Sequence, residues 1–213
     1  MSCVSDDVKT ATPIKPRATG YRQEQAQATR DRIAAAARRL FAVDGYRMTT
    51  MKAIAGEAGV ADRTVYSAFG AKREILSVIC EKWLEDAHAR EIVGAAVAEP
   101  DAWKTVRLAA HFLRSLFENG YDVVVLFDAA MAEDAQTKAL LRAKLDGRNH
   151  VMDLILASLG EQLVMPVPAA RAVYRALAAT GIYQELVIEA GWSNDRYEDW
   201  LYDQLGAQLL DSR

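Results

Sequence analysis

The fold is decided between residues 51 and 70, which read MKAIAGEAGVADRTVYSAFG. Two short apolar stripes with helical spacing flank one glycine: Ile54, Ala55 and Ala58 precede Gly59, and Val65, Ala68 and Phe69 follow it. Glycine adopts a left-handed backbone without steric strain, so Gly59 permits a sharp turn at the end of the first helix. The spacing places small Ala55 where two crossing helices touch and branched Val65 where their shared core closes. This pattern predicts a helix-turn-helix; the alternative is an ordinary helical hairpin in an all-α core.

Specific residues continue the pattern on both sides of this stretch. They are Ile33, Ala37, Leu40, Phe41 and Gly45 around an earlier helix, Thr49 and Thr50 before the motif, and Gly59, Val60, Thr64, Tyr66, Phe69 and Lys72 within and after it. On these residues, the run from Thr29 to Leu76 resembles the DNA-binding domain of the TetR family of bacterial transcriptional regulators. The resemblance covers under a quarter of the chain.

Two residues depart from the family pattern. Ala61 stands where the family often has a serine that caps the second helix of the motif, which is the recognition helix. We expect the acidic side chain of Asp62 to stabilise the positive N-terminal end of this helix instead. Arg63 stands where many members have a small residue, at the end of the helix that usually reads bases. We therefore expect Arg63 to contribute to sequence specificity.

The resemblance implies a set of DNA-binding residues, which are Arg47, Thr49, Thr50, Arg63, Thr64, Tyr66, Ser67 and Lys72. Thr50, Tyr66 and Lys72 suit phosphate oxygens, because a threonine at a helix start, a phenol and an ammonium all donate hydrogen bonds. Arg63, Thr64 and Ser67 are expected to face base edges. Two alternatives remain open: the ring of Tyr66 packs in the core, or Arg63 pairs with a nearby carboxylate.

The charge of the chain is unevenly distributed. The 213 residues carry a formal net charge of −3, but residues 1–72 contain 12 Lys+Arg against 7 Asp+Glu, and residues 73–213 contain 14 against 22. A basic segment attracts phosphates, whereas an acidic remainder is repelled by them. With 51% hydrophobic residues, the chain can bury a sizeable core in one or two domains.

Other classes of protein are disfavoured by what the sequence lacks. Cys3 and Cys80 form no disulfide framework, and Cys80 lies among apolar residues at helical spacing, as a small core residue would. His88, His111 and His150 fall on separate predicted helices without metal-ligand spacing, and there is no phosphate-binding loop or nucleophile elbow. We therefore expect no enzyme activity, no cofactor and no metal. Without a signal peptide or an apolar run of about 18 residues, a soluble cytoplasmic protein is expected.

We expect an all-α protein in three parts: a flexible basic arm over residues 1–25, a three-helix DNA-binding domain over 26–72, and a helical effector-binding and dimerisation domain over 73–213. The arm either enters a minor groove through Lys15, Arg17 and Arg22 or only keeps the protein soluble. Helices are expected near residues 28–44, 72–93, 103–118, 121–131, 134–159, 169–190 and 195–210, with no competing strand pattern. In the family, the helix corresponding to 72–93 couples the ligand to DNA.

The effector site is expected among aromatic residues, methionines and a few polar groups of the C-terminal part. The predicted residues are Trp103, His111, Phe127, Met131, Asn149, Met152 and Tyr183. A mostly apolar wall favours a hydrophobic or amphipathic organic molecule. Helical spacing also fits plain core packing for these residues, and Asn149 could serve a polar network instead.

The last two long helices are expected to form the dimer. Residues 169–190 and 195–210 each carry more apolar side chains than one core face needs, unless both faces are internal. The expected function is a homodimeric repressor that binds a palindromic operator and is released by a small effector. The alternatives are an activator or a ligand-independent DNA-binding protein of the same fold.

Overall fold

The computed structural model describes residues 18–211, and every regular element in that range is helical. The elements are α1 (Ala18–Met48), α2 (Met51–Ala58), α3 (Asp62–Phe69), α4 (Lys72–Asp86), α5 (Ala89–Ala98), α6 (Ala102–Glu118), α7 (Tyr121–Met131), α8 (Ala135–Leu159), the 3-10 turn η1 (Gly160–Gln162), α9 (Val167–Leu177), α10 (Thr180–Tyr183), the π-helix η2 (Gln184–Glu189) and α11 (Asn194–Leu209). The predicted all-α fold is confirmed. None of the helices in this range is long and apolar enough to cross a membrane.

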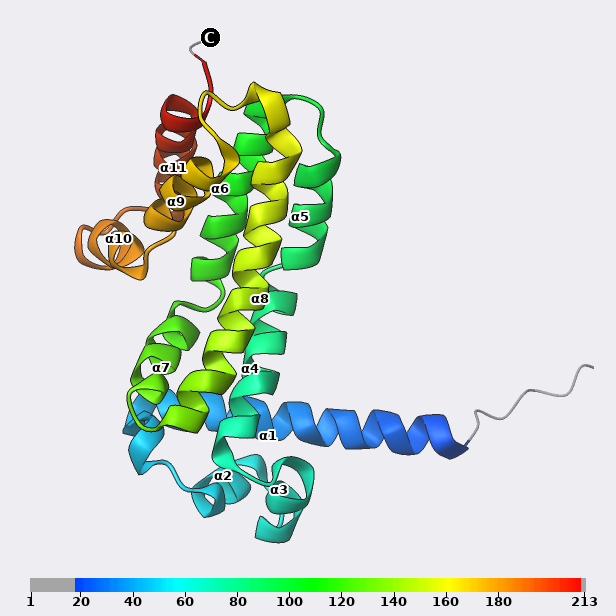
Figure 1. Ribbon diagram of the computed structural model, residues 1–213. Coiled ribbons are helices and arrows are strands. Elements are labelled where there is room, and N and C mark those ends of the chain that lie inside the picture. Colours follow the sequence, from blue (N-terminus) through cyan, green and yellow to red (C-terminus); the bar gives the residue numbers. More distant parts are fainter. Residues whose placement is uncertain (1–17, 212–213) are drawn as a thin grey trace, which may run out of the picture.

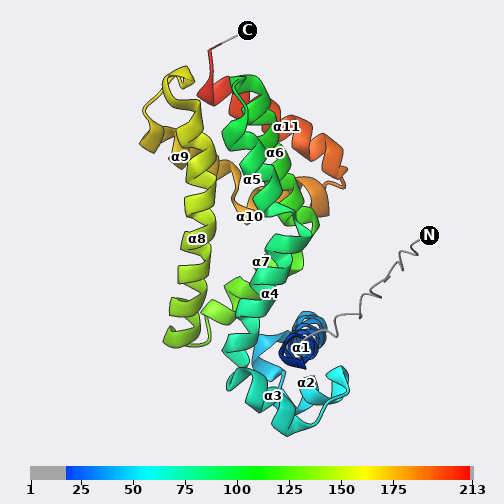
Figure 2. The ribbon, with the colours of Figure 1, turned by 90° about the vertical axis from the view of Figure 1, so that its right-hand side faces the viewer.

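The helices form a small unit and a larger one. Helices α1 to α3 gather at one end, α4 runs from that end to about the middle of the molecule, and α8 runs along most of its length (Figure 1). Helices α5, α6, α9 and α11 pack at the far end, and α7 lies beside α1 near the junction (Figures 1 and 2). Four predicted helices, those near 103–118, 121–131, 134–159 and 195–210, correspond closely to α6, α7, α8 and α11.

The single helix expected over residues 72–93 is wrong, because the chain breaks between α4 and α5. His88 adopts a left-handed conformation with φ 49°, and α5 restarts at Ala89. The Ser115 hydroxyl of α6 donates a hydrogen bond to the Ala87 carbonyl at 2.8 Å. This bond satisfies a carbonyl that the broken helix leaves free, so a residue 28 positions away stabilises the break.

The single helix expected over residues 169–190 is also wrong. Helix α9 ends at Leu177, and Ala179 is extended with ψ 133°. The chain then continues as α10 and the π-helix η2. Two backbone hydrogen bonds lie at the C-terminal end of η2, from Ala190 N to Glu185 O at 2.9 Å and from Trp192 N to Leu186 O at 3.0 Å. The alanines at the break carry no local signal for it.

The flexible arm expected over residues 1–25 is wrong where the structure describes it, because α1 is already helical from Ala18. Arg22 therefore lies on an exposed helix, whereas Lys15 and Arg17 lie outside the described residues. The end predicted for the first helix matches a break at Gly45, whose φ of 79° and ψ of 156° are non-helical. One further turn follows the break, up to Met48.

The final helix gives most of its apolar stripe to the core of its own chain. Tyr197, Leu201, Leu205 and Leu209 are at most 1% exposed, and α11 packs closely on α6. These four residues therefore form the core face of α11, and the predicted dimer interface is left to the other apolar residues of this helix. The Ser193 side chain caps α11 as expected, accepting a hydrogen bond from Arg196 N at 3.2 Å.

Candidate DNA-binding surface

The turn between α2 and α3 has the geometry predicted for it. Gly59 is left-handed, with φ 64° and ψ 39°, and Val60 N donates a hydrogen bond to Ala55 O at 3.0 Å. Ile54, Ala55 and Val65 are fully buried where the two helices meet. Because the buried side of each helix is fixed in this way, the remaining faces of α3 are held toward solvent.

The start of α2 is capped by one threonine and packed by the other. The Thr50 hydroxyl accepts a hydrogen bond from Ala53 N at 3.1 Å, and its side chain is exposed. Thr49 is only 3% exposed, and its hydroxyl donates to Gly45 O at 2.8 Å. Thr49 therefore faces the interior, and we leave it out of the contacts proposed below.

The exposed face of α3 carries the residues expected to meet DNA. Arg63, Tyr66 and Ser67 are exposed, and Thr64 is half-buried. Because Tyr66 is 54% exposed, the alternative that its ring packs in the core is wrong. Arg63 makes no ion pair with any carboxylate in residues 18–211, so its guanidinium is available to a ligand. Ala61 gives α3 no side-chain cap, and Asp62 occupies the first turn as expected.

An arginine of α1 fixes the other end of α3. Arg30 Nη1 donates a hydrogen bond to the Ala68 carbonyl, and its guanidinium lies 4.4 Å from the centre of the Phe69 ring. A cation at a helix C-terminus satisfies a free carbonyl and complements the helix dipole. No local pattern in the sequence indicates this contact, because 38 residues separate Arg30 from Ala68.

Lys72 binds backbone carbonyls of the same chain. Its ammonium donates to Tyr46 O, to Thr49 O at 3.0 Å and to Arg47 O at 3.3 Å, and it lies 4.2 Å from the centre of the Tyr46 ring. Burial lowers the pKa of Lys72. A lysine has three N–H donors, and all three have partners here. Lys72 thus ties the start of α4 to the link between α1 and α2, directly before Thr50.

We predict that Lys72→Met lowers the free energy of unfolding by about 1.5–3 kcal/mol, the usual contribution of hydrogen bonds to a charged group. Chemical denaturation measures this change. Lys52→Met, at an exposed position of α2, is the control and should change stability by less than about 0.5 kcal/mol. A Lys72→Met protein of unchanged stability that binds all DNA more weakly would instead support the predicted phosphate contact.

Arg47 is the remaining member of the predicted set. Its side chain is 81% exposed, and its Nε lies 3.9 Å from a carboxylate oxygen of Glu133, just beyond α7. Such a long and exposed pair holds the guanidinium only weakly. Arg47 therefore stays free to turn toward a phosphate beside Thr50.

The comparisons agree with this geometry. The model of the family described as bacterial regulatory proteins, tetR family, matches residues 33–79, which span the buried half of α1, all of α2 and α3, and the first half of α4. Residues 33–79 therefore carry a regulatory domain of the tetR family. No curated protein sequence matches the chain.

Solved structures share the fold of this chain along most of its length. FadR from Bacillus subtilis, in complex with stearoyl-CoA, superposes with a TM-score of 0.67 at 21% identity, covering 82% of this chain and 96% of its own. PfmR from Thermus thermophilus, a TetR family transcriptional regulator, gives 0.61 at 22% identity, covering 86% and 98%. NalD of Pseudomonas aeruginosa, the secondary repressor of the MexAB-OprM multidrug efflux pump, gives 0.71 at 17% identity, covering 89% and 100%. Each of these three proteins is named as a regulator or a repressor.

The larger unit of the protein has a cavity of about 260 Å³ between α7, α8 and α9. Three residues predicted for the effector site, Phe127, Asn149 and Met152, line it together. Its wall is more polar than expected, because it also includes Asp128, Arg175 and Thr180. Arg175 Nη2 donates to both carboxylate oxygens of Asp153, at 2.8 and 2.9 Å, so its charge is partly neutralised.

The other residues predicted for the effector site do not line this cavity. Trp103 packs on Tyr202, Met131 is half-buried, and the Tyr183 ring stacks on Phe117 at 4.9 Å. His111 Nδ1 lies 2.9 Å from a carboxylate oxygen of Glu198.

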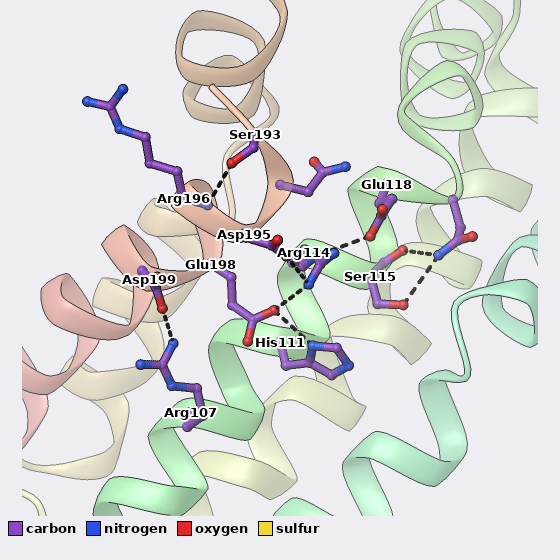
Figure 3. Close-up of polar contacts among 12 residues, drawn as sticks. Arg107, His111, Arg114, Ser115, Glu118, Ser193, Asp195, Arg196, Glu198 and Asp199 are labelled. Carbon is purple, nitrogen blue, oxygen red and sulfur yellow. Dashed lines mark hydrogen bonds and ion pairs between the residues drawn. The ribbon is translucent and has the colours of Figure 1, made fainter. Parts of the chain in front are cut away.

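The contact of His111 belongs to a network that joins α6 to α11. Figure 3 shows Arg114 of α6 reaching the same Glu198 carboxylate, at 3.2 Å, and Asp195, at 2.9 Å. Beside it, Arg107 pairs with Asp199 at 2.7 Å. The surroundings of His111 therefore join two helices within one chain.

Proposed function

We propose that the protein represses transcription by binding an inverted-repeat operator as a homodimer, and that a small amphipathic molecule in the cavity releases it. The observation that carries this proposal is the face of α3 on which Arg63, Tyr66 and Ser67 are exposed to solvent. Polar side chains held outward on a rigid recognition helix suit the edges and backbone of duplex DNA.

On this surface we assign different contacts to different residues. Arg63 reads a base edge, with Thr64 and Ser67 beside it, because an arginine at the start of a recognition helix can form two parallel bonds to guanine. Tyr66, Thr50 and Arg47 contact phosphates. Phosphate contacts position the protein but carry no sequence information, so specificity rests mainly on Arg63.

The dimer would form through the segment from η2 to α11. Ile188 is 52% exposed, and Leu186, Val187 and Trp200 are half-buried, so this edge keeps apolar area that its own chain leaves uncovered. A two-fold axis beside it would pair each patch with its own copy. Two α3 helices related by such an axis can enter successive major grooves if they lie about 34–36 Å apart.

The cavity between α7, α8 and α9 is the proposed effector site. Phe127 and Met152 supply apolar wall, whereas Asn149, Thr180 and Arg175 offer polar anchors, which together suit an amphipathic molecule. The cavity of about 260 Å³ is smaller than the roughly 300–1,000 Å³ of common ligand sites. FadR, seen with stearoyl-CoA, holds a far larger ligand. A compact effector therefore fits this conformation best.

Selection of binding sites from a random pool of DNA duplexes tests the proposal. We expect an inverted repeat to be enriched and to bind with a dissociation constant of about 10⁻⁸–10⁻¹¹ M, weakening steeply with salt. A thermal-shift screen of small amphipathic molecules should then yield compounds that also release this DNA. Selection that enriches no repeat at low salt contradicts the proposal.

A further inference from the structure

Helix α7 contacts the cavity and the DNA-binding unit at the same time. Val124, Phe127 and Asp128 of α7 line the cavity, and the helix packs against α1 (Figure 1). Every residue in the cavity wall lies on α7, α8, α9 or the link to α10 and its first residue. Helix α4, which the family resemblance favours as the coupling element, contributes none and ends at Asp86.

The contact between α7 and α1 is fixed by one arginine. Arg38 Nε donates to Asp122 Oδ2 at 2.7 Å, and Nη2 donates to Asp122 Oδ1 at 2.6 Å and to Asn119 O at 3.0 Å. A two-bond pair between guanidinium and carboxylate has a defined orientation as well as strength. Arg38 therefore binds both the first turn of α7 and the chain just before it.

Asp122 is joined rigidly to the cavity wall. It lies two residues before Val124 and five before Phe127 in one α-helix, so a shift of those side chains moves Asp122 as well. Arg38 is in turn joined rigidly to the DNA-binding unit. It follows Ile33 and Ala37 on the stretch of α1 whose buried face packs on α2 and α4.

We propose that the Arg38–Asp122 pair transmits occupancy of the cavity to the DNA-binding unit, so that α7 and α1 provide the coupling route. This proposal rests on the proposed function, and it names Arg38 and Asp122 as the residues that position the DNA-binding unit. An occupant that displaces Val124 and Phe127 moves the start of α7. The pair then carries α1, and with it α2 and α3, away from the arrangement that fits two major grooves.

A double-mutant cycle tests the coupling without knowing the effector. Ala178→Trp places an indole in the cavity as a permanent occupant, and Thr180→Trp is a second such variant in case the first does not fold. Affinity for the selected operator is measured with and without the indole in the wild-type and Arg38→Met backgrounds. We expect the indole to weaken binding about tenfold or more in the wild type, and less than about threefold in Arg38→Met.

Three further variants separate transmission from stability. The exchange Arg38→Asp with Asp122→Arg should restore the tenfold effect, because it rebuilds the pair with reversed ends. Arg39→Met removes the neighbouring arginine of α1, whose partner Glu57 lies on α2 at 2.9 Å, and should leave the effect unchanged. Lys144→Met removes a pair between α8 and α4, with Glu81 at 2.9 Å, and should also leave it unchanged.

The outcomes distinguish the two proposals. A wild-type protein that selects no operator overturns the proposed function and this coupling with it. If the protein binds the operator but the indole weakens binding equally in the wild-type and Arg38→Met backgrounds, the coupling alone is overturned. The same holds if the indole does not weaken binding in either background. Loss of the effect in Lys144→Met but not in Arg38→Met would place the route through α4 and also overturn it.

Discussion

Replacing Ile188 with arginine is expected to convert the protein from a dimer into a monomer and to weaken operator binding by about 10²–10⁴-fold. Ile188 lies on η2 with 52% of its surface exposed, beside half-buried Leu186 and Val187. Because a two-fold interface repeats each residue, one substitution places two unpaired guanidinium groups in an apolar contact. Sedimentation equilibrium measures the mass, and a gel-shift titration with the selected operator measures the affinity.

Val97→Arg is the matched control for this prediction. Val97 is 44% exposed on α5, which lies on the opposite side of the larger unit from α10 and η2 (Figure 1). This variant should remain dimeric and bind the operator normally. The proposed interface is wrong if the Ile188→Arg protein keeps the mass of a dimer.

Gly120→Ala is expected to lower the free energy of unfolding by about 3 kcal/mol or more, at the upper end of the effect of overpacking a core. A Cβ atom at Gly120 would lie 2.1 Å from Trp83 Cδ1 and 2.2 Å from Trp83 Nε1. The indole cannot easily move away, because Nε1 donates to Leu116 O at 2.7 Å and the ring packs edge-on against Phe127. Thermal unfolding should show a loss of about 6–12 °C in a domain of this size.

Gly94→Ala gives the comparison for Gly120→Ala. Gly94 lies within α5, and a Cβ atom there would have no neighbour within 4 Å. Alanine should therefore stabilise the helix by about 0.5–1 kcal/mol. Equal melting temperatures for the two variants would mean that Trp83 does not fill the space beside Gly120.

The parts of the fold that the sequence predicts well are those with local causes. Gly59 ends α2 because one residue must be left-handed there, and the apolar spacing around it needs only neighbouring residues. The breaks at His88 and Ala178 have no such local cause. The first depends on the Ser115 hydroxyl, which only the packing of α6 brings to the Ala87 carbonyl. Helix propensity cannot reveal a partner so far along the chain.

The candidate sites are predictable only in part for the same reason. Phe127 and Met152 can be predicted to face the interior because they are apolar, but their spacing fits a cavity wall and plain core packing equally. Arg175 looks like an ordinary surface arginine in the sequence, and only the folded chain places it at a cavity. The lysine at the start of α4 suggests a phosphate contact, whereas the structure gives its ammonium three backbone carbonyls.

The measurement that tests the central claim most directly is the base preference of Arg63→Ala. Wild-type and variant proteins are titrated against a set of operators that differ from the selected one by single base pairs. If α3 reads the DNA through Arg63, the variant loses about 1–3 kcal/mol of discrimination at one base pair of each half-site and keeps its preferences elsewhere. Arg39→Ala, which removes an arginine paired with Glu57, should keep the full pattern. An Arg63→Ala protein with an unchanged pattern, or with equal losses on every operator, would contradict the account.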